Sequence, residues 1–587
     1  MTTATLASTK ALGGGFLVQD ASPADVFTPE ELSEEHRAVA HTVDEFWANE
    51  VEPHLEAIRA QSPGVALGIL RKAAELGLTA IPIPEEFGGM AMDLPSVMIV
   101  GEHMARDSSF GSWYSAHTGI GTLPVLFFGN EEQKRKYLPK LAKVEMLAAY
   151  ALTEPLAGSD ALAARTRADL TPDGKHYVLN GQKMWITNGG AADLFTVFAK
   201  VGGEKFTAFL VERSFPGVSS GAEEHKMGMK GSSTTAVYFD NVRVRVENVL
   251  GEVGRGHIIA FNILNIGRLK LGPGAVGGAK NVLAICLKYA KERKAFGSSI
   301  AQFGAIQHKL GEIAIRIYAV ESMVWRVVGL IQGQLDAAQS GSHDAKAEMK
   351  ALEEYAAECS MVKVYASEML DYVVDEGVQI HGGYGFHQDY AVERAYRDSR
   401  VNRIFEGTNE INRLLITGML LKRATRGQLP LMAAAQTMLG KPSSRTPDST
   451  DGDAEARLVS QAKNIALLAL TLAFQKHGAE LDKQQEVVMN ISDIIMEVFA
   501  MESCLLRTRK LAGTSANAPE MCRVFLREAM DRIEVSAREV VGACSSESDG
   551  KKNLAALRNF AAYEPINSIA LRRNIAQRLL SAERYVV

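Results

Sequence analysis

The sequence predicts a mainly α protein with a central β domain and an additional α-helical domain in its C-terminal part. Apolar residues recur at helical spacing from about residue 29, change to short alternating runs between about 150 and 256, and return to helical spacing near 259. A polar segment, GKPSSRTPDSTDGD, then precedes a final helical stretch. The 587 residues exceed the usual size of one core, so two to four domains are expected.

The first helical block is expected to cover residues 29–148. Apolar side chains recur there at spacings of three and four, which is typical of amphipathic helices. One such stripe consists of Leu67, Leu70, Ala74 and Leu78. Residues 1–28 are expected to form a flexible N-terminal tail.

The β domain is expected to cover residues 149–258. Its alternating runs are YVLNG, LFTVFAKV, KFTAFLVE and TAVYFDNVRVRVENV, separated by Gly, Asn, Asp and Pro. No helix-length pattern separates the runs, so they predict antiparallel strands.

Two further helical blocks follow. The first covers residues 259–439, with an apolar stripe formed by Leu310, Ile313, Ile317, Val320 and Val324. Residues 440–455 are polar and contain proline, so we expect a flexible linker. Residues 456–587 rebuild amphipathic stripes and predict a C-terminal α-helical domain.

Composition narrows the possible functions. Lys and Arg total 64 against 69 acids, and no basic run is long enough to predict a nucleic-acid partner. The five cysteines are widely spaced, which favours reduced thiols and predicts no metal site. The start MTTATLASTKALGGGF resembles neither a signal peptide nor a transit peptide, and no uninterrupted apolar run reaches ~18 residues. We expect a cytoplasmic protein.

One glycine motif looks like a nicotinamide-binding fingerprint. GPGAVG, residues 272–277, fits GxGxxG, and Glu292 lies twenty positions after its first glycine. The fingerprint needs a buried strand before it, whereas the preceding NILNIGRLKL carries Asn265, Arg268 and Lys270 and the surrounding periodicity is helical. Small residues that permit close helix packing are the better interpretation.

Several other motifs contain polar groups suited to a cofactor. YALTEPLAGSD (150–160) and KMWITNGG (183–190) offer hydroxyls and backbone amides, and Trp185 offers a flat apolar face. Ordinary turn chemistry would also explain both segments. ERKAFG, QIHGGYGF and RDSRVNRIFEGTNE follow, and each alone is a weak signal.

The ordered set is more specific. YALTEPLAGSD, KMWITNGG, MGMKGSSTTAVYFDNVRVRVENVLG, ERKAFG with FGAIQ, QIHGGYGF and RIFEGTNE strongly resembles the acyl-CoA dehydrogenases, flavoenzymes that desaturate acyl-CoA thioesters. The resemblance covers residues 30–430, and the extra helical block makes the chain most similar to the very-long-chain subgroup. It implies an α domain, a β-barrel and a four-helix bundle, with FAD between the barrel and the bundle.

The resemblance also assigns cofactor residues. Those expected to border FAD are Tyr150, Leu152, Thr153, Ser159, Trp185, Ile186, Thr187, Gly382, Thr408 and Glu410. A further group, expected to touch the FAD of an adjacent subunit, comprises Arg293, Phe296, Gln307, Gln379 and Gly383. The resemblance therefore implies a homodimer.

Glu406 corresponds to the family's catalytic base, which removes the α proton of the acyl-CoA while the flavin accepts the β hydride. A dry site would raise the proton affinity of this carboxylate. One branch of the family carries its base immediately before the arginine equivalent to Arg268. That position is Gly267 here, so the sequence favours Glu406.

Substrate contacts are implied for Ser159, Asn265, Arg268 and Gly407. Where medium-chain relatives close the acyl pocket, this chain carries Ser112 and Ala116, which could admit a longer chain unless Trp113 and Tyr114 fill the space. The resemblance thus favours long-chain acyl-CoA, its conversion to trans-2-enoyl-CoA in fatty-acid β-oxidation, and an electron-transfer flavoprotein as acceptor.

Two other functions stay open at this point. An acyl-CoA oxidase would keep the fold but reoxidise its flavin with oxygen, and a dehydrogenase-like scaffold would use the C-terminal helices to dock a partner. LPLMAAAQTMLG, residues 429–440, loosely resembles the membrane-associating stretch of the very-long-chain subgroup. Peripheral membrane contact and an ordinary packed helix both fit it.

Overall fold

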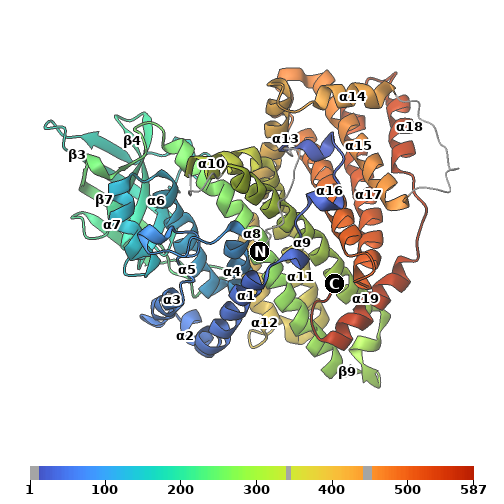
Figure 1. The fold of residues 1–587 in the computed structure, drawn as a ribbon, viewed down its shortest axis with the longest axis horizontal. Helices are drawn as coiled ribbons and strands as arrows, with labels where there is room; N and C mark the ends of the chain where they lie inside the picture. The colour runs from blue at the N-terminus through green and yellow to red at the C-terminus, as the bar shows by residue number, and fades with distance from the viewer. Residues whose placement is uncertain (1–11, 339–344, 441–452) are drawn as a thin grey trace.

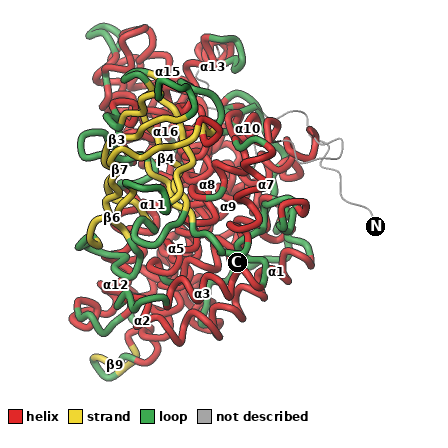
Figure 2. The backbone as a smooth tube through the Cα atoms, turned by 90° about the vertical axis from the view of Figure 1, so that its left-hand side faces the viewer, coloured by secondary structure: helices red, strands yellow, loops and turns green. Residues whose placement is uncertain are grey.

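The computed structural model describes residues 12–338, 345–440 and 453–587 (Figure 1). The strands of its central sheet gather at one end of the molecule and its C-terminal helices at the other, with the long helices α8, α9 and α11 between them (Figure 1). A view turned by 90° shows the same strands gathered on the face toward the viewer, with helices around them (Figure 2). The mainly helical class with a central sheet is confirmed.

The first described helices precede the sheet. They are α1 (Glu34–Phe46), α2 (Leu55–Arg59), α3 (Val65–Glu75), α4 (Leu94–His103), α5 (Ser108–Ala116), the π-helical turn η8 (His117–Gly121), α6 (Leu123–Phe128) and α7 (Glu131–Ala142). Sequence signals set their starts; Asn130 and Gln133, for example, form a capping box that begins α7. Trp47, Phe110 and Trp113 belong to the local core.

The central sheet is mixed. Its strands are β1 (Ala148–Ala151), β2 (Arg167–Leu170), β3 (His176–Thr187), β4 (Leu194–Val201), β5 (Lys205–Glu212), β6 (Val218–Glu223), β7 (Thr234–Arg245) and β8 (Val249–Leu250). The order is β6-β7-β3-β2-β4-β5-β8, and β1 pairs with β4 off this path.

Two sequence expectations for this sheet need correction. β1 and β2 both pair with β4 in parallel, so the wholly antiparallel prediction is wrong. Alternating runs reveal strands but not pairing direction, which depends on the path between them. The strand order has two ends, β6 and β8, so the closed barrel that the resemblance implies is not shown.

The helical region after the sheet contains the long helices. It consists of α8 (Gly256–Glu292), α9 (Gly304–Ala338), α10 (Ala345–Glu354), α11 (Ala356–His381), α12 (Ala391–Ser399), α13 (Asn409–Thr425) and α14 (Leu431–Gly440). α11 packs against α8, α9 and α13. GPGAVG lies inside α8, where a Cβ at Gly272 or Gly277 would collide with neighbouring helices. Close packing, not nucleotide binding, explains the motif.

The C-terminal extension is α-helical, as predicted. Its helices are α15 (Ala454–His477), α16 (Gln485–Lys510), α17 (Asn517–Cys544), α18 (Gly550–Ala561) and α19 (Ser568–Ala582). α16, α17 and α19 all pack on α9, so the extension shares a core with the preceding helices. The helical stretch Ala454–Lys483 is long and apolar enough to cross a membrane, but 67% of its apolar window is buried in the protein.

Residues 12–28 do not form the flexible tail that we expected. Phe16, Leu17 and Val26 are buried, and the ring of Phe16 lies 4.9 Å from that of Phe499 on α16. The Gly14 N–H donates to the Glu358 carboxylate at 2.6 Å. Burial of these apolar side chains against α16 offsets the entropy lost by ordering the segment.

The predicted linker lies almost wholly outside the described residues, because 441–452 fall there. Its described ends are helical, since α14 ends at Gly440 and α15 begins at Ala454. The segment thought able to rest on a membrane, residues 429–440, contains the whole of α14, which packs on α15. Leu431, Ala435 and Met438 are buried, so the apolar face of α14 contacts protein.

Candidate active site

Glu406 sits at a sharp backbone turn just before α13. Glu406 and Gly407 both adopt left-handed conformations, with φ of 56° and 80°. That conformation costs a non-glycine residue roughly 1 kcal/mol or more, so surrounding contacts must hold it. Arg268 Nε on α8 donates to the Glu406 carbonyl at 3.1 Å, and Asn412 Nδ2 donates to the Gly407 carbonyl at 2.8 Å.

The turn aims the Glu406 carboxylate into a protein interior. Its Oε2 is buried and has no hydrogen-bond partner in the described part of the chain. Burial raises the pKa of Glu406 to about 7, and the nearby cations of Arg268 and Lys363 oppose that rise. A carboxyl with this pKa can take up a proton near neutral pH.

Gly267 on α8 makes the space for this carboxylate. A Cβ built at Gly267 would lie 2.7 Å from Glu406 Oε2 and 2.8 Å from its carboxyl carbon. Real Cβ atoms do not approach oxygen so closely, so any side chain here would displace the acid. Position 267, which carries the base in one branch of the family, is thus a glycine here and leaves room for the carboxylate of Glu406.

Lys363 on α11 is a residue of this site that we did not predict. Its Nζ donates to the Gly407 carbonyl and to Asn409 Oδ1, both at 2.7 Å. The side chain is buried, and it supports the turn as well as the charge balance of Glu406. The available signal was a lysine inside the apolar run MVKVYASEML, because buried lysines need specific partners.

We expect the activity to depend on pH through Glu406. Only the ionised carboxylate accepts a proton, so kcat/KM should fall about tenfold per pH unit below a pKa of about 7 and level off above it. The check is a profile of kcat/KM from pH 5.5 to 8.5. An acid limb that is absent over this range would contradict the assignment.

The sheet places a second set of predicted residues near Glu406. Tyr150 on β1 is buried, its hydroxyl donates to the Ala260 carbonyl on α8 at 3.3 Å, and burial together with Glu406 raises its pKa. The carbonyl of Thr153 accepts from the N–H of Met184, next to Trp185. Leu152, Thr153 and Trp185 thus lie side by side at the ends of β1 and β3.

Trp185 fits a role in holding a planar group. The register of β3 against β7 shifts between Lys183 and Ile186, and Trp185 has a φ of 56° within this bulge. Its side chain is 61% exposed, whereas Ile186 is buried. A left-handed backbone that presents an exposed aromatic ring costs free energy, and a flat, exposed apolar surface suits a planar cofactor such as a flavin.

A buried ion pair connects the segment that follows β1 with strand β3. Lys183 Nζ donates to Glu154 Oε1 at 2.7 Å and to the Leu152 carbonyl at 3.1 Å, and both charged side chains are buried. Lys183 and hydrogen bonds from Thr166 and Arg165 lower the pKa of Glu154 against the effect of its burial. The pair joins the strand end after β1 to β3.

Replacing Lys183 by Met should destabilise the sheet. The change leaves the Glu154 carboxylate buried without its cationic partner, which lowers the free energy of unfolding by on the order of 3 kcal/mol. We expect a lower Tm and weaker retention of the cofactor, measured by calorimetry and absorbance. The double variant Lys183→Met with Glu154→Gln should recover part of the loss; no recovery would mean that stranded charge is not the cause.

The residues assigned to an adjacent subunit's cofactor form a separate, exposed group. Arg293 and Phe296 lie on the hairpin of β9 (Lys294–Ala295) and β10 (Ser298–Ser299). The Arg293 guanidinium lies 5.4 Å from the ring of Tyr384 in the turn η12 (Gly382–Phe386). Phe296 is 97% exposed. Within the described residues, no hydrogen bond or ion pair joins this group to Glu406.

The remaining predicted residues are placed as follows. Gln379, Gly382 and Gly383 are exposed at the end of α11, and Gln307 on α9 donates to the Ala301 carbonyl at 3.0 Å. Thr408 caps α13, with Glu410 exposed in its first turn. Ser159 is exposed in a loop, and Thr187 ends β3. Asn265 Oδ1 accepts from Arg268 at 2.9 Å, so both belong to the shell of Glu406.

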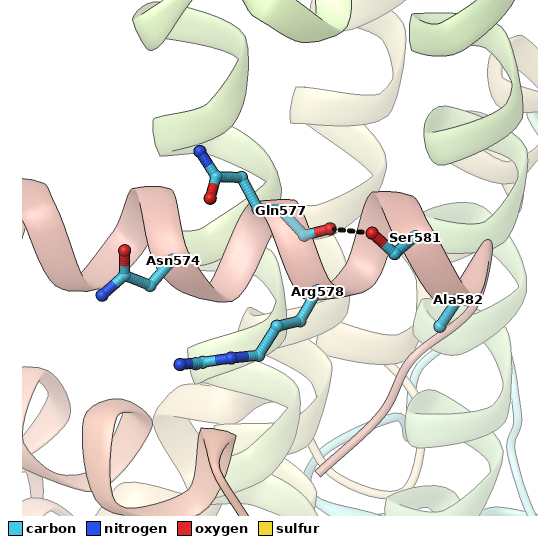
Figure 3. A pocket seen from close by; sticks show the side chains of 5 residues that line it. All are labelled: Asn574, Gln577, Arg578, Ser581 and Ala582. Atoms are coloured by element: carbon cyan, nitrogen blue, oxygen red, sulfur yellow. Dashed lines mark hydrogen bonds between the residues drawn. The ribbon is translucent and has the colours of Figure 1, made fainter.

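One surface depression is unrelated to this site. It has a volume of about 510 Å³, and its lining residues all come from α19. Figure 3 shows Asn574, Gln577, Arg578, Ser581 and Ala582 along one side of that helix. Arg578 already pairs with Glu520 at 2.6 Å. The depression is an open helix face without catalytic groups.

Known proteins place this arrangement in one family. Three acyl-CoA dehydrogenase domain models match in order: the N-terminal domain at residues 33–145, the middle domain at 149–242 and the C-terminal domain at 254–421. A fourth model, also described as an acyl-CoA dehydrogenase C-terminal domain, matches residues 461–559. A Bacillus subtilis protein described as a probable acyl-CoA dehydrogenase is 47% identical over 98% of both chains. The chain belongs to the acyl-CoA dehydrogenase family.

Other acyl-CoA dehydrogenases refine this assignment. The human very long-chain specific acyl-CoA dehydrogenase is 36% identical, over 81% of this chain and 74% of its own length. The solved acyl-CoA dehydrogenase from Bacillus anthracis, complexed with FAD, matches with a TM-score of 0.96, 47% identity, and coverage of 98% of this chain and 100% of that one. The family resemblance predicted from the motifs is confirmed, and with it the oxidoreductase class.

Proposed function

We propose that the protein is an FAD-dependent dehydrogenase that converts long-chain acyl-CoA to trans-2-enoyl-CoA in fatty-acid β-oxidation, with Glu406 as its base. The Glu406 carboxylate carries this proposal, because its Oε2 is buried with no partner among the described residues and desolvation raises its pKa to about 7. The FAD held by the Bacillus anthracis relative supports the cofactor. When bound, FAD supplies the acceptor for the hydride that leaves the β carbon.

The residues of this chain act on the α carbon and the thioester. Glu406 removes the α proton, and the loss of hydration in a dry site makes its carboxylate a stronger base than an exposed one. In the described structure no hydrogen bond engages the Glu406 N–H, so this amide is free to donate to the thioester oxygen. That bond strengthens as the oxygen gains enolate charge. Asn265, Arg268 and Gly407 border this position.

Long-chain preference rests on the α5 region and on the relatives. Ser112 and Ala116 are small, and both lie on α5. Trp113 Nε1 donates to the Gly231 carbonyl at 3.0 Å and Tyr114 hydroxyl donates to the Leu78 carbonyl at 2.7 Å. Both rings belong to the N-terminal core. In this proposal the acyl chain therefore runs past the small side chains of Ser112 and Ala116 and not past these rings.

We also propose a homodimer that passes electrons to an electron-transfer flavoprotein in the cytoplasm. The exposed group of Arg293, Phe296 and Tyr384 presents two aromatic rings and a cation, which suits a subunit interface. All five cysteines are free and buried, in keeping with a reducing compartment. Sedimentation at micromolar concentration tests the dimer.

An anaerobic titration tests cofactor, reaction and chain length together. The purified yellow protein is mixed with saturated acyl-CoAs of four to twenty carbons while the flavin absorbance is followed. We expect bleaching that is strongest with long chains. A colourless protein, or a flavin that no acyl-CoA bleaches, would overturn the proposed function.

The oxidase and scaffold alternatives have their own readouts. An oxidase would form peroxide in air at the rate of substrate consumption, whereas a dehydrogenase would need an added acceptor. A scaffold would retain a specific partner through residues 456–587. The Glu406 site supports a catalytic function, whether the flavin is reoxidised by oxygen or by another acceptor.

A further inference from the structure

Lys270 on α8 is a partly buried lysine without a carboxylate partner among the described residues. Its Nζ has one hydrogen bond, to Thr118 Oγ1 at 3.4 Å, and no described carboxylate pairs with it. Burial lowers its pKa to about 8, so the side chain is still mostly charged at neutral pH. A buried charge without a partner is costly, and such groups concentrate at functional sites.

Other lysines with little exposure have a carboxylate nearby. Lys183 pairs with Glu154 at 2.7 Å, Lys280 with Glu102 at 2.7 Å, and Lys463 with Glu502 at 2.6 Å. Lys363 bonds to Gly407 and Asn409 but lies close to the Glu406 carboxylate. No described carboxylate lies so close to Lys270, and its neighbour His117 offers no compensation. Nδ1 of His117 accepts from the Ala148 N–H at 3.1 Å, and burial lowers the pKa of His117 to about 4, so the ring is neutral.

The position of Lys270 connects it with the catalytic turn. Lys270 follows Gly267 by three residues, so both project from the same face of α8, about one turn apart. Gly267 faces the Glu406 carboxylate, whereas Lys270 faces the turn η8. A Cβ at Gly119 in η8 would lie 3.3 Å from Lys270 Nζ. η8 continues directly from α5, which carries Ser112 and Ala116.

We propose that Lys270 recognises a carboxylate carried on the far part of the acyl chain. An acyl-CoA with its α carbon at Glu406 and its chain between α8 and α5 runs along the face that presents the Lys270 ammonium. A terminal carboxylate would supply the missing counter-charge, and Thr118 would position the ammonium for it. Thr118 Oγ1 already donates to the Tyr114 carbonyl at 2.9 Å, so it can only accept from Lys270.

This inference rests on the proposed function and adds a substrate class to it: acyl-CoAs that end in a carboxylate. A site built for a charged group rejects the uncharged analogue because its own polar group then stays unpaired. A plain hydrocarbon chain of the same length should therefore be the poorer substrate at one particular length. The acyl-chain length with the greatest preference for a terminal carboxylate measures the distance from the thioester to Lys270.

The test compares terminal-carboxylate acyl-CoAs with plain acyl-CoAs over a series of lengths, using holoenzyme. In the wild type, the ratio of their kcat/KM values should peak at one length. Lys270→Met should lower this peak ratio at least ~10-fold. Lys288→Met, an exposed lysine on the same helix, should leave the ratio unchanged.

Two readouts keep the outcomes distinct. Bleaching of the flavin by plain acyl-CoAs reports the proposed function, whatever happens to the ratio. Flavin content and Tm report folding, and Lys270→Met should not lower the Tm, because it removes an unpaired buried charge. A ratio that is the same in wild type and Lys270→Met at every length would overturn the assignment.

Discussion

Glu406→Gln should lower turnover at least ~10²-fold, the low end of the loss when a general base is removed. Glutamine has almost the same shape as glutamate but cannot accept the α proton. The turn should survive, because Arg268, Lys363 and Asn412 hold its backbone carbonyls and not its carboxylate. Steady-state turnover of a long-chain acyl-CoA with an added electron acceptor measures the effect.

The variant must be shown to keep its cofactor. We expect Glu406→Gln to stay yellow with the same flavin content as the wild type. Glu132→Gln, an exposed acid of α7, serves as the control for loss of a glutamate charge and should turn over normally. Normal turnover of Glu406→Gln itself would remove Glu406 from the mechanism.

Gly267→Ala should be the second most damaging change, although it adds one methyl group. The new Cβ would lie 2.7 Å from Glu406 Oε2, so the carboxylate must move. A displacement of about 1 Å from a productive position can cost ~10²-fold in rate. Alanine favours a helix over glycine by about 1 kcal/mol, so α8 itself should not weaken. The readout is kcat with unchanged flavin content.

Gly278→Ala supplies the matched control on the same helix. A Cβ there would meet the Leu370 side chain at 3.6 Å and the Ala105 carbonyl at 3.7 Å, which are ordinary contacts. This variant should be fully active. If Gly267→Ala were equally active, the close approach of Gly267 to the base would have no catalytic meaning.

The sequence predicted the elements and the family better than it predicted their pairing. The ordered motifs single out Glu406, Gly267 and Trp185, because these residues lie in recognisable segments. The parallel pairs of β1 and β2 with β4 depend on the path between strands, which alternation does not encode.

The sequence also did not predict which residues form contacts with distant parts of the chain. Lys363 joins the site only because α11 lies beside the turn at Gly407, and nothing in its own neighbourhood specifies that partner. Residues 12–28 looked like a tail, yet Phe16 and Val26 find a surface on the distant α16. The first contact joins residues 44 apart in the sequence, and the second joins residues 484 apart.

Hydrogen exchange at the α carbon tests the central claim most directly. A saturated acyl-CoA is incubated with the holoenzyme in deuterated buffer without oxygen or electron acceptor. The recovered thioester is then analysed by mass spectrometry. The wild type should place deuterium at the α carbon, and Glu406→Gln should do so at least ~10²-fold more slowly. Equal exchange by the two proteins would show that another group removes the proton.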